Sequence, residues 1–206
     1  MKIIERKIEE FQNDHFFFPI RTKIDFAKLL LNSTRQLLIG EPIDKEEKNL
    51  CLFKLIVDKM SRLFFYTTDK FFSISFPFNV LLQDDELIEI TTYSGEPVDN
   101  QSISSAISVL NDPQFQLKPS PMGFLFQNDG AEMLGLNLLE EIFMFEPAYV
   151  RYDHDPQNQN GNLHPLHHLD VNYSSYGTYK LGLNNAIIVT HFEDILNIST
   201  DCRFLH

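Results

Sequence analysis

Apolar residues recur every three or four positions in the first third of the chain, which is the spacing of an amphipathic helix. This spacing predicts a short helix over residues 4–11 and a longer one over residues 45–65. Between them, Asp25 is placed to cap a helix that ends at Gly40. Residues 1–68 are therefore expected to be mainly helical.

After residue 71 the apolar period shortens to two and β-branched residues become common, as in strands. Strands are expected over residues 72–76, 86–93, 123–126, 148–153, 167–173 and 179–183. Helices are expected over residues 99–110, in the middle of 134–145 and within 186–198. Turns at 94–97 and 128–130 and a polar loop at 156–161 separate neighbouring elements.

These elements predict an α+β protein, in which an N-terminal helical layer packs on a mostly antiparallel sheet with a C-terminal hairpin rich in His and Asp. The 206 residues suit a single domain, mainly helical over residues 1–68 and a sheet with helices over residues 69–206. A chain of this length can bury a core without disulfides or metal ions. Its 19 Phe and lack of Trp indicate that Phe, Leu and Ile build that core.

Cysteine content and the N-terminal sequence predict a cytoplasmic protein. The two cysteines, Cys51 and Cys202, do not make a disulfide framework, so both are expected to be reduced. Residues 1–10 are charged and lack the apolar centre of a signal peptide. No window approaches 18 uncharged apolar residues, so we expect no membrane-spanning segment.

The chain is acidic, with 29 Asp and Glu against 17 Lys and Arg and a formal net charge of -12. This balance opposes non-specific binding to nucleic acid, whose phosphates need cationic partners. Nucleic acid is therefore expected only as a substrate, at a site where a metal ion supplies positive charge locally. The same negative charge suits docking on a basic partner protein. The simplest explanation is that the charge only keeps the protein soluble.

Residues that could carry chemistry are concentrated near the C-terminus, in residues 151–170, which contain four of the seven histidines. Side chains alternate between the two faces of a strand. If the strands on either side of the polar loop pair as a hairpin, their non-core face brings together Arg151, Asp153, His168 and Asp170. His164, at the loop exit, is placed to close over the same patch.

Two carboxylates and two imidazoles can bind a divalent metal ion or act without one. The predicted metal ligands are His164, His168, Asp153 and Asp170, since neutral His nitrogens and Asp oxygens bind such ions. Without metal, His168 would act as general acid or base, oriented by Asp170 or Asp153. Arg151 would contact phosphate. The hairpin can equally be a structural hydrogen-bond network, and His167, on the core face, is expected to be a packing residue.

The motif in residues 151–156 and 164–169 resembles an uncharacterised bacterial family known only as a domain of unknown function. The family pattern is a strand with Arg-Tyr/Phe-Asp-x-Asp-Pro, followed by His-Pro-x-x-His-Leu. It maps onto Arg151, Asp153, Asp155, Pro156, His164, Pro165 and His168. The chain departs from the pattern at residues 179–183, where Tyr-Lys-Leu-Gly-Leu replaces an Arg-Ile-Pro-like segment. A weaker similarity links the hairpin to small toxin-like proteins of bacterial defence and toxin–antitoxin loci.

Three functions are compatible with these observations. The first is a small nuclease-like or phosphodiesterase effector of antiviral defence that uses the His/Asp hairpin, with or without a divalent metal ion. The second is a non-catalytic acidic subunit that docks on a larger protein, encoded by a neighbouring gene, in a defence or toxin–antitoxin system. The third is a sensor that binds a small nucleotide or a metal ion without turnover.

Overall fold

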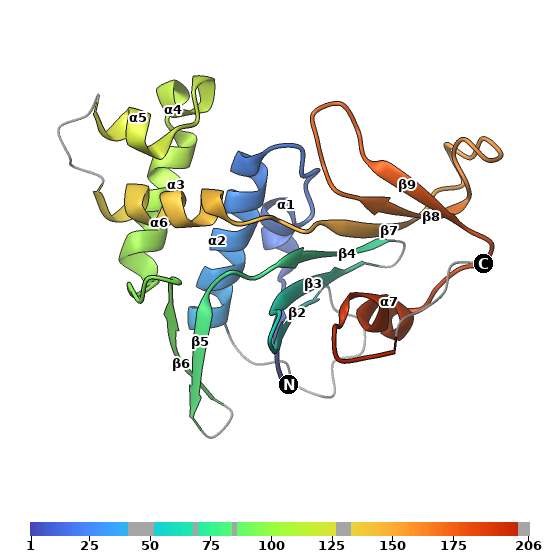
Figure 1. Cartoon of the computed structure of the whole chain (residues 1–206), viewed down its shortest axis with the longest axis horizontal. Coiled ribbons are helices and arrows are strands. Elements are labelled where there is room, and N and C mark those ends of the chain that lie inside the picture. Colours follow the sequence, from blue (N-terminus) through green and yellow to red (C-terminus); the bar gives the residue numbers. More distant parts are fainter. Residues whose placement is uncertain (41–51, 68–69, 84–85, 127–132, 202–206) are drawn as a thin grey trace. The chain divides into compact units, whose positions relative to one another are not determined.

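A seven-stranded sheet is the largest element of the chain, which we describe from a computed structural model (Figure 1). The structure describes residues 1–40, 52–67, 70–83, 86–126 and 133–201. The strand order is β1 (Lys2–Lys7), β2 (Leu52–Val57), β3 (Arg62–Tyr66), β4 (Lys70–Ser75), β7 (Val150–His154), β8 (His167–Val171) and β9 (Tyr179–Leu183). Every pairing from β2 to β9 is antiparallel. With its helices, this sheet confirms the predicted α+β class.

Contacts divide the chain into two units, and each unit is discontinuous in sequence. The first, which we call the sheet unit, comprises residues 1–5, 48–76 and 147–206. The second, the helical unit, comprises residues 6–47 and 77–146. Both units combine stretches that are far apart in the chain, and the single domain remains a prediction.

One face of the sheet unit is covered by α7 (Val189–Leu196), which Figure 1 shows in red beside β3. Phe192 of α7 is fully buried, and its ring centroid lies 6.1 Å from that of Phe64 and 5.1 Å from that of Phe71. Tyr152 continues this cluster onto β7. Large aromatic side chains contribute most of the apolar area that a core buries. They therefore determine which face of β7 points into this core.

The opposite face carries a row of cross-strand neighbours that changes from aromatic to charged. From β2 to β9 the row consists of Phe53, Phe65, Phe72, Arg151, Asp170 and Lys180. The three Phe rings are stacked, with 5.8 Å between the first two centroids and 4.6 Å between the second and third. Because side chains alternate along each strand, the charged half of the row lies on the face away from α7.

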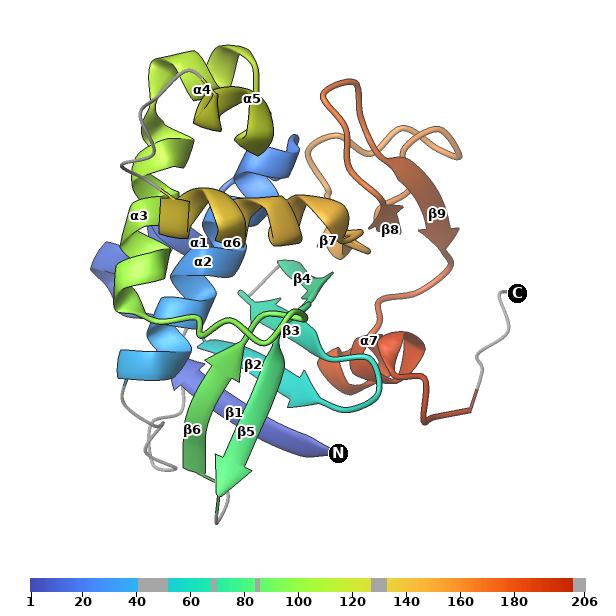
Figure 2. The same cartoon turned by 60° about the vertical axis from the view of Figure 1, so that its left-hand side comes forward.

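The helical unit is built around α2 (Lys23–Ile39), α3 (Asn100–Asn111) and α6 (Met133–Met144), which Figure 2 shows side by side. Its smaller elements are η1 (Glu10–Gln12), α1 (Asn13–Phe16), α4 (Pro113–Leu117), α5 (Pro121–Leu125), β5 (Asn79–Gln83) and β6 (Glu86–Thr91). At Gly135 of α6, an added Cβ atom would lie 2.5 Å from the backbone of α3. The two helices thus approach each other at a position that admits only glycine.

The helix predicted to end at Gly40 is confirmed as α2, but its predicted cap is wrong. Thr22 is the N-cap, and its hydroxyl accepts a hydrogen bond from the backbone N–H of Asp25. The Asp25 carboxylate in turn accepts from the backbone N–H of Thr22 at 2.9 Å, which completes a capping box. Asp25 therefore supports the first turn from inside the helix.

Three other predicted elements are wrong. Residues 4–11 contain the end of β1 and the start of η1 instead of one helix. The described part of residues 45–65 forms β2 and β3, whereas residues 45–51 lie outside the described residues. β3 is largely buried on both faces, so its continuous apolar run does not show a period of two. The strand predicted over residues 123–126 falls on α5, which Ser120 caps.

The remaining predicted strands and helices are confirmed within a few residues, as β4, β6 to β9, α3, α6 and α7. β5 was not predicted. The turn predicted at 128–130 and both cysteines, Cys51 and Cys202, lie outside the described residues. Among the helices that the structure describes, none combines the length and the apolar character needed to cross a membrane.

Candidate metal site

Antiparallel pairing of β7, β8 and β9 brings the predicted site residues together. Arg151 pairs with Asp170, and Asp153 pairs with His168. Asp170 also pairs with Lys180 of β9 on its other side. The predicted hairpin is therefore confirmed, and its charged residues share one face because side chains alternate along each strand.

The cluster is buried, although the sequence placed it on a non-core face. His168 is 0%, Asp170 1% and Asp153 3% exposed. Buried carboxylates cost free energy unless they are paired with a cation or bind a metal ion. The charges that surround these two aspartates therefore decide what the cluster can do.

Two cations neutralise the two carboxylates. Arg151 bridges them, since its Nη2 lies 2.5 Å from Asp170 Oδ2 and 2.6 Å from Asp153 Oδ2. Lys180 Nζ donates to Asp170 Oδ1 at 2.7 Å and to His168 Nε2 at 3.0 Å. The side chains of Arg151 and Lys180 are 24% and 29% exposed, so they connect the buried cluster to the surface.

Hydrogen bonding fixes the tautomer of His168. Its Nδ1 lies 2.9 Å from the carbonyl oxygen of Pro165, which can only accept a hydrogen bond. Nδ1 therefore carries the hydrogen. Nε2 lies 3.0 Å from the ammonium of Lys180, which can only donate, so Nε2 carries the lone pair. Metal-binding histidines are usually oriented in this way, with the second ring nitrogen bonded to a carbonyl or carboxylate. Nε2 lies 3.8 Å from a carboxylate oxygen of both Asp153 and Asp170.

The surrounding groups keep Asp170 ionised. Burial raises the pKa of a carboxyl group, because the charged form loses its hydration. Hydrogen bonds from Lys180 and Thr178, together with the charges of Arg151 and Lys180, outweigh burial and hold the pKa of Asp170 below its ordinary value. Asp170 is therefore available as an anionic ligand at neutral pH.

One carboxylate oxygen in the cluster has no partner among the described residues. Asp153 Oδ1 is buried, and no described group donates a hydrogen bond to it. Buried polar atoms nearly always have a partner, so an unpaired one indicates a site for water or an ion. Three possible ligand atoms, one from each of Asp153, His168 and Asp170, lie within 4.8 Å of one another. Ligands about 2.1 Å from a shared ion are at most roughly 4.2 Å apart. A small inward shift of the three side chains would therefore bring their ligand atoms to bonding distance of one ion.

His164, predicted as a metal ligand, lies beside this group and not within it. Its ring contacts the His168 ring edge-on, with 4.8 Å between the centroids. Its Nε2 lies 3.1 Å from Asp155 Oδ2. Hydrogen bonds from Asn158, and then from His164, hold the pKa of Asp155 below its ordinary value. His164 thus pairs with the carboxylate of Asp155 in the loop. It lies next to His168, with which it was expected to bind the metal ion.

His167 points to the other face of β8, as predicted for a packing residue. Its Nδ1 lies 2.9 Å from the hydroxyl of Tyr152, and its ring stacks on His154 with 5.0 Å between the centroids. Burial, followed by the neighbouring His154 and His168, lowers the pKa of His167. His167 therefore links the hairpin to the core and has no contact with the aspartates that the structure records.

Lys180 is the cluster residue that the sequence analysis missed. It lies on the third strand of the hairpin sheet, directly opposite Asp170. The strand over residues 179–183 was expected, but its pairing partner was not. Extending the alternation rule to that strand, with β8 as its neighbour, would have placed Lys180 on the same face as Asp170.

Comparison of the chain with protein-family models, with curated proteins and with solved structures finds no match. The motif resemblance of residues 151–169 to a bacterial family therefore remains a prediction. The function has to be inferred from the geometry of the cluster.

Proposed function

We propose that Asp153, His168 and Asp170 bind one divalent metal ion and that the protein uses it to hydrolyse phosphodiesters. The observation that carries the proposal is a buried group in which one ligand atom from each of Asp153, His168 and Asp170 lies within 4.8 Å of the others, and in which Asp153 Oδ1 has no hydrogen-bond donor among the described residues. Three protein ligands leave positions for water and substrate, as in catalytic metal sites. A mixed nitrogen and oxygen donor set favours manganese, cobalt or zinc over calcium.

Arg151 and Lys180 are the phosphate-binding groups in this proposal. A guanidinium stays charged at all relevant pH values and matches two phosphate oxygens at once. Lys180 Nζ contacts His168 Nε2 and Asp170 Oδ1, which are two of the three atoms that an ion would bind. Metal binding therefore competes with Lys180 and releases its ammonium group toward the partly exposed edge of the cluster.

The residues of the chain prepare the site for this reaction. The Pro165 carbonyl holds the His168 lone pair toward the carboxylates. Arg151 keeps the carboxylates of Asp153 and Asp170 together. A bound ion would activate a water molecule and neutralise charge that develops on the phosphate. Local positive charge of this kind lets an acidic protein act on an anionic substrate.

The proposed setting is a cytoplasmic effector of a bacterial defence or toxin–antitoxin system, which rests on the motif resemblance alone. The second candidate function is the non-catalytic acidic subunit that docks on a larger protein. One observation favours it: the two carboxylates of Asp153 and Asp170 are matched in charge by Arg151 and Lys180. The cluster would then be a structural ion network that needs no metal.

Metal content separates these two functions. Full-length protein purified without chelator or histidine tag should contain one transition-metal ion per chain by elemental analysis. His168→Ala and Asp153→Asn should lose it. His191→Ala, which alters an exposed histidine of α7, is the matched control and should keep it.

Activity is then measured on bis(p-nitrophenyl) phosphate and on short RNA and DNA oligonucleotides. Cleavage should stop with EDTA and return with added manganese, and it should be lost in Asp153→Asn. A wild-type chain that neither contains nor binds a divalent ion at micromolar concentration would overturn the proposal and leave the ion network as the explanation.

A further inference from the structure

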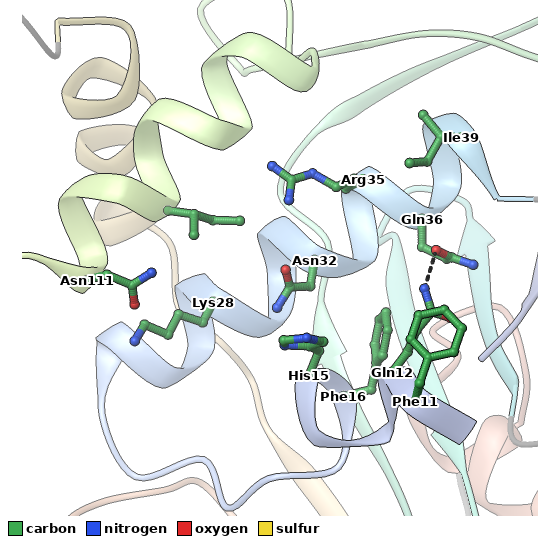
Figure 3. Close-up of a pocket in the computed structure, with 11 residues that line it drawn as sticks. Phe11, Gln12, His15, Phe16, Lys28, Asn32, Arg35, Gln36, Ile39 and Asn111 are labelled. Carbon is green, nitrogen blue, oxygen red and sulfur yellow. Dashed lines mark hydrogen bonds between the residues drawn. The ribbon is translucent and has the colours of Figure 1, made fainter. Parts of the chain in front are cut away.

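A pocket of about 480 Å³ opens in the helical unit, between the N-terminal turn of η1 and α1, one face of α2, and α3 (Figure 3). The residues that α2 contributes share one helical face: Lys28, Asn32, Arg35, Gln36 and Ile39. His15 and Phe16 lie on one side of this row, and Asn111 lies on the other. The volume is in the range of small-molecule sites, roughly 300–1,000 Å³.

The described lining of this pocket is basic in a strongly acidic chain. It includes Lys28, Arg35 and His15 and contains no Asp or Glu. Arg35 donates a hydrogen bond to Ser104 Oγ at 2.9 Å, and no carboxylate of the described residues pairs with it or with Lys28. With 29 acidic against 17 basic residues, such a patch does not follow from average composition. The pocket is therefore complementary to an anion.

The rest of the lining is apolar and partly open to solvent. Phe11 is 81% and Ile39 61% exposed, whereas Phe16, which also lines the pocket, is buried. Exposed large apolar side chains at the rim of a pocket favour an occupant that covers them. An aromatic ring such as that of Phe11 stacks well on a flat heterocycle. Asn32, which Figure 3 shows between the basic groups and His15, can form hydrogen bonds with a polar edge.

From these features we infer that the pocket binds a small organic phosphate with a flat ring, of which a nucleoside monophosphate is the simplest form. Lys28 and Arg35 bind the phosphate, and His15 lies beside it. Phe11 and Ile39 cover the ring. The pocket shares no residue with the group of Asp153, His168 and Asp170, so binding in it does not depend on the proposed metal ion.

Calorimetric titration of the full chain in EDTA tests the inference with three probes. AMP carries the phosphate and the ring, ribose 5-phosphate carries only the phosphate, and adenosine carries only the sugar and ring. AMP should bind at least tenfold more tightly than either fragment. If ribose 5-phosphate binds as tightly as AMP, the ring contact is wrong and the inference fails.

Variants locate the binding in this pocket. Lys28→Gln and Arg35→Gln should each weaken AMP binding about tenfold, since each removes a charge-assisted contact. Arg21→Gln, at an exposed position just before α2, is the matched control and should leave affinity unchanged. Asn32→Tyr keeps both cations but fills the pocket, and it should abolish binding. AMP binding that is undetectable at millimolar concentration, or that is unchanged in Arg35→Gln, would overturn the inference.

Discussion

Lys180 and Asp170 face each other across β8 and β9, with the lysine ammonium 2.7 Å from Asp170 Oδ1. The same ammonium lies 3.0 Å from His168 Nε2. It therefore contacts two of the three atoms proposed to bind a metal ion. A side chain in this position acts as a competing cation if the site binds metal, and as the essential counterion if the site is an ion network.

Replacing Lys180 with Gln separates these roles. Loss of a unit charge about 4 Å from a divalent ion removes repulsion, which is several kcal/mol even at an effective dielectric constant near 20. Lys180→Gln should therefore bind manganese at least tenfold more tightly than wild type in a calorimetric titration. Its phosphodiesterase rate should fall, because the phosphate loses a contact.

The control for this prediction is Lys59→Gln, which removes an exposed lysine from the turn between β2 and β3. It should change neither manganese affinity nor rate. If Lys180→Gln lowers the melting temperature and still binds no manganese, Lys180 serves only to neutralise Asp170, and the metal site is not supported.

A second prediction concerns Ala148, which adopts a positive φ of 45°. Its carbonyl accepts a hydrogen bond from the buried Arg62 at 2.6 Å, and Arg62 also donates to Ser73 Oγ at 3.0 Å. Residues with a Cβ atom are strained in this conformation, by about 1–2 kcal/mol, and glycine is not. Ala148→Gly should therefore raise the free energy of unfolding by about 1 kcal/mol, measured by urea denaturation.

Ala186→Gly is the comparison for that substitution, because Ala186 is also exposed and outside regular structure but does not have a positive φ. It should leave stability unchanged or lower it slightly, since glycine adds freedom to the unfolded chain. Equal effects of the two substitutions would mean that the strain at Ala148 is negligible.

The hairpin shows what local pattern can predict in this chain. Tyr152 is apolar enough to identify the core face of β7, so Asp153 follows on the other face and His168 meets it once the strands pair. β9 has no comparable signal, because its side chains are mostly exposed and no apolar alternation marks an inner face. The position of Lys180 depends on the pairing of β9 with β8, which the sequence of β9 alone does not indicate.

The helix predicted over residues 45–65 failed for a different physical reason. Leu63, Phe64 and Phe65 follow one another and are all buried, so β3, which lies between β2 and β4, is buried on both faces. A strand of this kind is a continuous apolar run, which also fits the buried face of a helix. The pocket of the helical unit was missed because its lining comes from segments that are separated in sequence, so no motif connects His15 with Asn111.

A third prediction concerns the crossing of α3 and α6. A Cβ atom on Gly135 would lie 2.5 Å from Ala106 N and 2.5 Å from Ser105 C, which are backbone atoms that cannot move alone. Gly135→Ala should therefore separate the helices and lower the free energy of unfolding by about 1–3 kcal/mol. Asn137→Ala, exposed on the same helix, should raise stability slightly because alanine favours helix. A Gly135→Ala chain as stable as wild type in urea would contradict this close approach.

A fourth prediction concerns pH and the cap of α3. Asp99 Oδ1 accepts hydrogen bonds from the backbone N–H groups of Ser102 at 2.8 Å and Gln101 at 3.0 Å. These bonds, that of Ser102 above all, hold the pKa of Asp99 below its ordinary value. A lowered carboxyl pKa in the folded state stabilises the fold above the unfolded pKa of about 4, and this stabilisation is lost as pH falls through the folded pKa.

Asp99→Asn and Asp99→Ala separate the charge of this cap from its hydrogen bonds. Asparagine caps a helix about as well as aspartate but does not titrate, so Asp99→Asn should be less stable than wild type at pH 6. The difference between their melting temperatures should shrink as pH falls from 5 to 2, because wild type loses its charge over that range. Asp99→Ala should be less stable than Asp99→Asn at every pH, by about 1 kcal/mol, because it loses the cap itself. Melting curves in which the wild-type advantage over Asp99→Asn does not change with pH would show that the Asp99 charge contributes nothing to the stability of α3.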